Sequence, residues 1–171
     1  MPTVLIIAGP NGAGKTTFAD ALLKRRHELF EFVNADEIAR RMRWSTYDAA
    51  SDLIAGREML KLLDALTDER RDIALETALA SLSYARRIAR WRAAGYRVEL
   101  VYLRLASVEE SLSRVRRRVA MGGHDIPEQD IRRRFPKSLR HLDEIYKPIV
   151  DSWQIWLSGA EGLQLLDSSP S

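Results

Sequence analysis

The stretch Gly9-Pro10-Asn11-Gly12-Ala13-Gly14-Lys15-Thr16 decides the fold of this chain. It fits the pattern G-x-x-x-x-G-K-[ST], in which glycines let the backbone wrap around phosphates that a lysine also reaches. The apolar run Thr3–Ala8 precedes it and is typical of a strand buried on both faces. Apolar residues at helical spacing follow it, so the loop lies at a helix N-terminus, where free amides and the helix dipole attract an anion. The sequence therefore predicts a nucleotide-binding phosphate loop.

The whole loop is expected to hold the phosphates of the nucleotide. The predicted nucleotide-binding residues are Gly9, Pro10, Asn11, Gly12, Ala13, Gly14, Lys15, Thr16 and Thr17. Lys15 is expected to reach the β- and γ-phosphates and to take part in catalysis, and the Thr16 hydroxyl is expected to bind the metal ion. The implied cofactors are ATP and Mg²⁺.

The composition bounds the class of protein. The chain has 171 residues, a size typical of one domain that can bury a real hydrophobic core. It contains no cysteine, which excludes disulfides, thiolate metal sites and cysteine nucleophiles. No apolar run is long enough to span a bilayer, and no signal peptide is recognisable. We therefore expect one nucleotide-binding domain over residues 1–171, located in the cytoplasm and without a membrane partner.

Strand-like and helix-like segments alternate along the chain, which predicts an α/β fold with helices on both faces of a mainly parallel central sheet of about five strands. The predicted strands are Thr3–Ala8, Glu31–Asn34, Arg71–Glu76 and Tyr96–Leu105, with a terminal hairpin or single strand from Trp153–Leu157 and Leu163–Leu166. The predicted helices run from the loop to about His27, over Glu37–Arg43, from Ser45 or Thr46 through Leu66, over Ala80–Ala94, from the capping box Ser107–Glu110 to about Met121, and onward from Pro127 in a first turn. In the third of these helices the residues expected to face inward are Leu53, Ile54, Met59, Leu60 and Leu63.

Acidic residues end two of the predicted strands. Asp36 lies just past the second strand, and Glu76-Thr77 ends the third. Because ligands bind beyond the carboxyl ends of parallel strands, these residues lie on the same edge of the sheet as the phosphate loop. A carboxylate there can take the proton of an attacking hydroxyl, so we predict Asp36 as the general base, although aspartate also suits a helix cap. Glu76 is predicted to hold the water shell of Mg²⁺ or to bind a substrate hydroxyl, and Thr77 to bind substrate or to cap a helix.

A strongly basic segment at about 112–135 predicts a lid, with a Gly122-Gly123 hinge between two basic helices. Arginines that close over the site would neutralise the charge that develops on a transferred phosphoryl group. The predicted lid residues of the site are Arg114, Arg118, His124, Arg133 and Arg134. The first two share a helical face and are predicted to be catalytic, and the other three are predicted to bind substrate. No aromatic residues are interleaved for base stacking, so nucleic acid is disfavoured as a partner.

Four segments together carry a resemblance to a known family. They are GPNGAGKTTFA (residues 9–19), FVNADEIA (32–39), LETALAS (75–81) and RVRRRVAMGGHDIPEQDIRRRF (114–135). With these motifs, the chain resembles the zeta toxin family from Thr3 to about Pro148, and in particular its short bacterial P-loop kinases. The phosphate loop is shared by many families, whereas the second and fourth segments are considerably more specific.

The resemblance implies a P-loop kinase fold and a function. The implied enzyme moves the γ-phosphate of ATP to a hydroxyl of UDP-N-acetylglucosamine, and a small antitoxin that covers the ATP site is the implied protein partner. Asp36 matches the general base of the family, and Glu76 and Thr77 match its contacts with the sugar nucleotide.

The lid departs from the family pattern at one point. Arg114 or Arg118 matches the first of the two phosphate-binding arginines of the family. Three positions before Pro127, where the family has its second arginine, this chain has His124. The charge can instead be supplied by one of two later arginines, Arg133 or Arg134.

Two alternatives remain open at the level of the sequence. A nucleic-acid 5′-hydroxyl kinase also uses a phosphate loop, an aspartate and arginines. A nucleotide-binding regulator without turnover is consistent with the departure at His124. The first would show oligonucleotide binding that depends steeply on salt, and the second would bind ATP without phosphorylating any acceptor.

Overall fold

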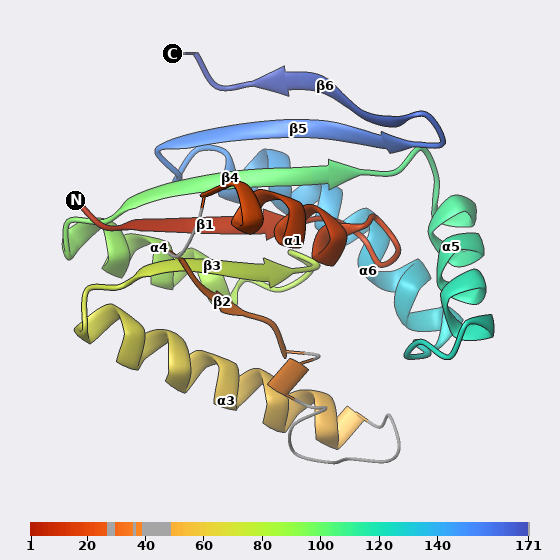
Figure 1. Ribbon diagram of the computed structural model, residues 1–171, viewed down its shortest axis with the longest axis horizontal. Helices are drawn as coiled ribbons and strands as arrows, with labels where there is room; N and C mark the ends of the chain where they lie inside the picture. The colour runs from red at the N-terminus through yellow and green to blue at the C-terminus, as the bar shows by residue number, and fades with distance from the viewer. Residues whose placement is uncertain (27–29, 36, 39–48, 171) are drawn as a thin grey trace.

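The computed structural model describes residues 1–26, 30–35, 37–38 and 49–170. Figure 1 shows one sheet with helices on both of its faces. The strands are β1 (Thr3–Ala8), β2 (Phe30–Val33), β3 (Asp72–Thr77), β4 (Arg97–Arg104), β5 (Ser152–Gly159) and β6 (Gly162–Ser168). The helices are α1 (Lys15–Arg26), α3 (Ala49–Asp68), α4 (Ser83–Ala93), α5 (Val108–Ala120) and α6 (Glu128–His141), followed by a π-helical turn, η1 (Leu142–Tyr146). The predicted α/β fold is confirmed.

The sheet has the strand order β2-β3-β1-β4-β5-β6, which places β1 in its interior. Neighbouring strands from β2 to β5 are parallel, and β6 pairs antiparallel with β5 in a hairpin. The sheet has six strands rather than the predicted number of about five, because both C-terminal segments form strands. Since parallel strands end at one edge of a sheet, the loops that follow β1 to β4 meet at that edge.

The core lies on both faces of the sheet, and β1 shows why. Val4 and Ile6 pack on the face that α3, α4 and the end of α6 cover, whereas Leu5 and Ile7 pack on the face that α1 covers. All four side chains are at most 2% exposed. Burying one such side chain contributes roughly 1.5–3 kcal/mol, which explains why this strand has no polar alternation.

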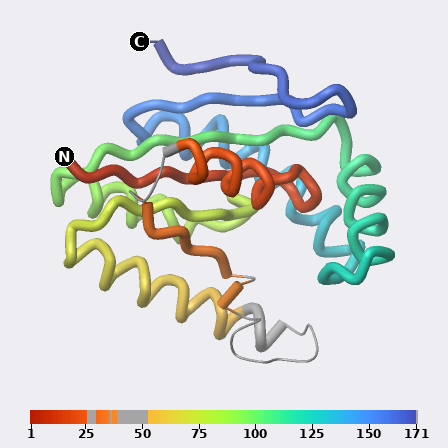
Figure 2. The backbone as a smooth tube through the Cα atoms, in the orientation of Figure 1, coloured from red at the N-terminus to blue at the C-terminus, as the bar shows by residue number. Residues whose placement is uncertain are grey.

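The inward face predicted for the long helix α3 is right for three of its five residues. Met59 and Leu63 are buried, and Leu60 packs against the same core, but Leu53 is 57% and Ile54 is 41% exposed. The reason is length. Helix α3 has 20 residues and β3 has 6, so at about 1.5 Å per helical residue and about 3.3 Å per strand residue the helix is the longer element. The sheet therefore cannot cover the whole length of α3, which Figure 2 shows running alongside it. Leu53 lines an open cleft instead.

The predicted lid forms a unit of its own. Leu112 and Val115 of α5 pack against Ile126 and Ile131, away from the two main core clusters. This small apolar cluster holds α5, the connecting loop and α6 together. The lid therefore has a defined shape in this structure, and it can present side chains to the edge of the sheet.

The N-terminal ends of the two lid helices are close to those predicted, but the capping box and the position of Pro127 each differ in one detail. The Ser107 hydroxyl caps α5 by accepting a hydrogen bond from the Glu110 N–H (3.2 Å). The Glu110 carboxylate accepts in return from the N–H of Ala106 (3.2 Å), one residue earlier than in a full capping box. Pro127 is the N-cap of α6 and not a residue of its first turn, because its ψ of 133° is extended.

Several predictions concern residues outside the described part of the chain. They are the general base Asp36, the helix end near His27, most of the helix Glu37–Arg43 and the helix start at Ser45 or Thr46. Ala35, Glu37 and Ile38 are described and helical. Among the described helices, none combines the length and the hydropathy that crossing a membrane requires.

Candidate active site

The phosphate loop connects the end of β1 to the first turn of α1, as the sequence predicts. Gly9 has a φ of 147°, and a Cβ there would lie 2.3 Å from the carbonyl oxygen of Leu103 on the neighbouring strand. Inside the loop the Ala13 N–H donates to the Pro10 carbonyl (3.2 Å). The first helical bond runs from the Phe18 N–H to the Gly14 carbonyl (2.9 Å). The remaining amides at this helix N-terminus form the kind of site that binds phosphate.

Lys15 is held inside the loop. Its side chain is 8% exposed, and its Nζ donates to the Pro10 carbonyl (3.1 Å). The same Nζ lies 3.9 Å from Oε1 of Glu76, at the end of β3. A buried ammonium needs such partners, because leaving water without them is costly. Lys15 is therefore positioned by the loop on one side and by the sheet on the other.

Glu76 is the point where three elements converge. Its Oε2 accepts a hydrogen bond from the Thr16 hydroxyl of α1 (2.8 Å) and another from the Asn34 side-chain amide after β2 (2.9 Å). Sequence reasoning assigned no role to Asn34, although its place at a strand end beside Asp36 was a usable signal. Asn34 is buried, which makes it a fixed part of this arrangement.

The Thr16 hydroxyl and the Glu76 carboxylate suit a magnesium ion. Both are hard oxygen donors, which Mg²⁺ prefers, and they adjoin the loop that would hold the phosphates. In the described ranges, no group of three or more His, Asp or Glu residues could hold a metal without further ligands.

A cleft of about 960 Å³ lies over Lys15, Asn34 and Glu76. Its volume is in the range of small-molecule sites. Its floor comes from the loop and the strand ends, one wall from α3, and the other from the lid. The polar residues that line it include Asn11, Lys15, Asn34, Arg57, Glu76, Thr77, His124, Asp130, Arg133 and Arg134. The structure thus brings the five predicted substrate-binding residues together with Lys15.

Thr77 does not cap the next helix, which was the alternative to substrate binding. Helix α4 begins at Ser83, and its N-cap is Leu82. The Thr77 hydroxyl instead accepts a hydrogen bond from the N–H of Leu79 (3.0 Å) in the turn after β3. Thr77 therefore stabilises the turn that forms part of the cleft floor, and its role towards substrate stays a prediction.

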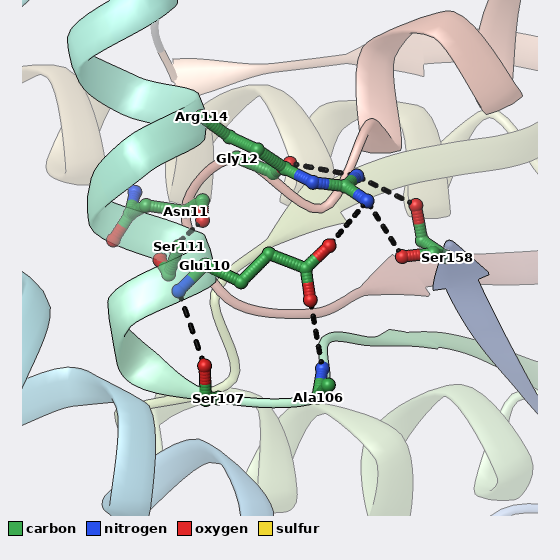
Figure 3. A network of polar contacts seen from close by, with 8 residues as sticks. All are labelled: Asn11, Gly12, Ala106, Ser107, Glu110, Ser111, Arg114 and Ser158. Carbon is green, nitrogen blue, oxygen red and sulfur yellow. Dashed lines mark hydrogen bonds and ion pairs between the residues drawn. The ribbon is translucent and has the colours of Figure 1, made fainter. Parts of the chain in front are cut away.

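Arg114 and Arg118 are absent from the residues that line the cleft. The Arg114 guanidinium bonds to Glu110, to Ser158 and to the outer side of the phosphate loop (Figure 3). Arg118 donates to the backbone carbonyl of His124 (2.8 Å), so it supports the lid loop. The two arginines share a helical face, but that face packs against protein. Their catalytic assignment stays a prediction that this arrangement does not favour.

Arg57 is a cleft residue that sequence reasoning missed. It lies on α3, across the cleft from the lid, and its side chain is exposed. A charged position on an amphipathic helix is ordinarily a solvated one, so the pattern contained no specific signal. Only the position of α3 relative to the lid reveals that Arg57 faces the same space as Arg133.

Tyr84 lines the cleft as a neutral group. Burial raises the pKa of its phenol to about 12, so it keeps its proton at neutral pH. Its hydroxyl contacts the sulfur of Met59 (3.5 Å). Tyr84 can therefore shape the cleft but is unsuited to act as a general base.

Known proteins resemble this chain in sequence and in fold. The family model described as "Zeta toxin" matches residues 1–155. The chain belongs to the zeta toxin family. A relative in Haemophilus influenzae, described as an uncharacterized protein, is 27% identical over 131 residues, which is 77% of this chain and 91% of the relative.

Solved structures share the fold at lower identity. The PezAT chromosomal toxin-antitoxin system of Streptococcus pneumoniae matches with a TM-score of 0.71 and 17% identity, over 98% of this chain and 72% of that one. AvrRxo1-ORF1:-ORF2 with ATP matches with a TM-score of 0.77 and 17% identity, over 98% of this chain and 58% of that one. This zeta toxin family member therefore has the fold of P-loop kinases and spans little more than half of the AvrRxo1 chain.

Proposed function

We propose that this protein is an ATP-dependent kinase that transfers the γ-phosphate to a hydroxyl of a small anionic acceptor. A sugar nucleotide such as UDP-N-acetylglucosamine is the first candidate. The observation that carries the proposal is the convergence of Lys15, Thr16 and Asn34 on Glu76, beside a phosphate loop and under a cleft with basic walls. Membership of the zeta toxin family supports the same reaction class.

On the nucleotide side, the loop amides and Lys15 would bind the β- and γ-phosphates. Thr16 would be a ligand of Mg²⁺, and Glu76 would bind the ion or its water shell. The ion, when bound, supplies neutralisation of the charge on the phosphate oxygens. Lys15 is already desolvated, so little reorganisation is needed when the phosphates arrive.

On the acceptor side, Asp36 is the proposed general base, and Thr77 the proposed contact with the sugar nucleotide. Arg133 and Arg134 line the cleft, so we assign the role of lid arginines to them rather than to Arg114 and Arg118. His124 adds a third polar group from the lid. Arg57 faces the cleft from α3, where a phosphate of the acceptor could be bound.

A small antitoxin that covers the ATP site is part of the proposal. It is supported by the family and by the toxin-antitoxin system named for one structural neighbour. Because the proposed substrates are ATP and a sugar nucleotide, the proposed activity would take place in the cytoplasm.

The test is ³¹P NMR of the protein with Mg²⁺ and ATP, in the presence and absence of UDP-N-acetylglucosamine. We expect a new sugar-phosphate resonance matched by the appearance of ADP. ADP without that resonance would retain the kinase and reject this acceptor, and a 5′-hydroxyl oligonucleotide would then be tried in its place. Bound ATP with no turnover for any acceptor would contradict the proposal.

Asp36→Asn tests the proposed base separately. The variant should lose phosphoryl transfer while it still binds ATP, because only the proton acceptor is removed. Calorimetry with ATP and the same NMR assay measure the two properties. Retained transfer would reject Asp36 as the base.

A further inference from the structure

Helix α5 packs directly against the outer side of the phosphate loop. A Cβ on Gly12, whose φ is 79°, would lie 3.0 Å from Cβ of Arg114 and 3.1 Å from the carbonyl oxygen of Ser111. Such distances are shorter than ordinary van der Waals contact. Glycine at position 12 therefore serves a second purpose besides loop curvature, because it lets a helix from the lid approach the loop backbone.

Two side chains of α5 bind the loop backbone. The Ser111 hydroxyl, which is fully buried, donates to the carbonyl of Asn11 (2.5 Å). The Arg114 guanidinium donates to the carbonyl of Gly12 through Nη1 (3.5 Å, at the limit for a hydrogen bond). Consecutive carbonyls at the tip of the loop are thus held by one helix.

The other donors of Arg114 reach the C-terminal hairpin (Figure 3). Nη1 bonds to the Ser158 hydroxyl (2.9 Å) and Nη2 to the Ser158 carbonyl (2.7 Å), near the end of β5. Nη2 also pairs with Glu110 (2.6 Å), one helical turn away. Because Glu110 neutralises the guanidinium, the effect of Arg114 on the loop comes from geometry more than from charge.

The orientation of the carbonyls determines the orientation of the amides. In a trans peptide the carbonyl of one residue and the N–H of the next point in opposite directions. Holding the Asn11 carbonyl against α5 therefore turns the Gly12 N–H away from α5. A loop whose peptide planes are already oriented loses less entropy when it binds phosphate, and it binds more tightly for that reason.

We propose that Arg114 is a positioning residue that holds the phosphate loop in its phosphate-binding conformation. Ser111 is its partner on α5, and Ser158 extends the arrangement to the C-terminal hairpin. This inference rests on the proposed binding of ATP by the loop but is independent of the acceptor. It differs from a catalytic role for Arg114, because a positioning residue affects the binding of ADP and ATP alike, whereas a catalytic arginine mainly affects turnover.

The experiment compares Arg114→Ala, Arg114→Lys and Ser158→Ala with the wild type. Arg117→Ala is the matched control, because Arg117 is an exposed arginine on the same helix. The dissociation constants of ADP and ATP are measured by calorimetry. Hydrogen exchange of the peptide that contains residues 9–16 is measured without nucleotide. Circular dichroism verifies that each variant is folded.

For Arg114→Ala we expect the Kd of both nucleotides to rise about tenfold or more, because the hydrogen bonds that hold the Gly12 carbonyl and join α5 to Ser158 are lost. Exchange in the loop should be faster, with no change in β4 or α3. Arg114→Lys should be intermediate, since an ammonium cannot reproduce the fork of donors. Ser158→Ala should show a smaller effect in the same direction, and the control should behave as the wild type.

The inference is overturned if Arg114→Ala is folded and binds ADP as the wild type does, with unchanged exchange in the loop. It is also overturned if only turnover falls. A wild-type protein that binds neither nucleotide would contradict the proposed function itself, so the two failures are distinguishable.

Discussion

The two ends of the cleft are built in different ways. At the nucleotide end, Lys15 is 8% exposed and is held by contacts with its own loop and with Glu76. At the other end, the side chains that face the cleft include three exposed ones, Arg57 on α3 and His124 and Arg133 in the lid. Under the proposed function, phosphate binding would therefore depend on a buried loop whose side chains are already held in place. Recognition of the acceptor would depend on how α3 and the lid are placed relative to each other.

Replacing Lys15 should have the largest effect. We expect Lys15→Met to lower the rate of phosphoryl transfer by about a thousandfold, because one preorganised charge at the transferred phosphoryl group is lost. A coupled assay of ADP formation measures this. Lys24→Met, an exposed lysine on the same helix α1, is the control. If Lys15→Met retains activity within a factor of about ten of the wild type, the proposal that the nucleotide end of the cleft is preorganised around Lys15 is wrong.

Glu76→Gln should have the next largest effect. The amide can still accept the Thr16 hydrogen bond, but the negative charge near the proposed magnesium site is lost. Activity should fall by roughly 10–100-fold, in part because more Mg²⁺ is required. The rate is measured as a function of Mg²⁺ concentration, with Glu99→Gln on strand β4, a residue outside the cleft lining, as control. An unchanged Mg²⁺ dependence would show that Glu76 only orders the protein.

Arg57→Ala should sharpen the distinction between the two ends. The KM of an anionic acceptor should rise about tenfold, because a charge-assisted hydrogen bond is lost, while the KM of ATP stays the same. Lys61→Ala is the matched control, one turn further along α3 and outside the cleft lining. Equal acceptor KM values in both variants would remove Arg57 from the site.

The smallest effect is expected for the ion pair that joins α3 to α4. The hydrogen bond from Arg87 holds the pKa of Asp64 below its usual value of 3.8. Asp64 is 41% exposed, so Asp64→Asn should cost less than about 1 kcal/mol of stability at pH 7. It should leave transfer unchanged, since neither residue lines the cleft.

The pH dependence of that pair has a definite sign. The pKa of Asp64 is lower in the folded protein than in the unfolded chain. The ion pair therefore contributes its full stabilisation above pH 3.8, and this contribution is lost as the pH falls through the folded-state pKa. Urea unfolding should therefore show a difference between wild type and Asp64→Asn at pH 7 that shrinks in strong acid. A difference that grows on acidification would contradict this assignment of the pKa.

Much of the site was predictable because its residues lie at the ends of strands in an alternating sequence of strands and helices. Gly9 to Thr16 follow a buried strand, and Glu76 ends another, so the parallel sheet brings them to one edge. Asn34 was accessible to the same reasoning, as a polar residue that follows β2, but it was missed. The exposure of Leu53 and Ile54 was not predictable, because it depends on how the first turns of α3 lie relative to the sheet.

By itself the sequence determined the phosphate loop, the α/β alternation and the basic segment at about 112–135, since each depends on spacing and residue type within a short segment. Only the tertiary structure decided which arginines face the cleft. It turned Arg114 towards the loop backbone and Ser158, and it placed Arg57 opposite Arg133. The physical reason is that a helical sequence specifies which residues share a face, whereas packing between distant segments decides what that face meets.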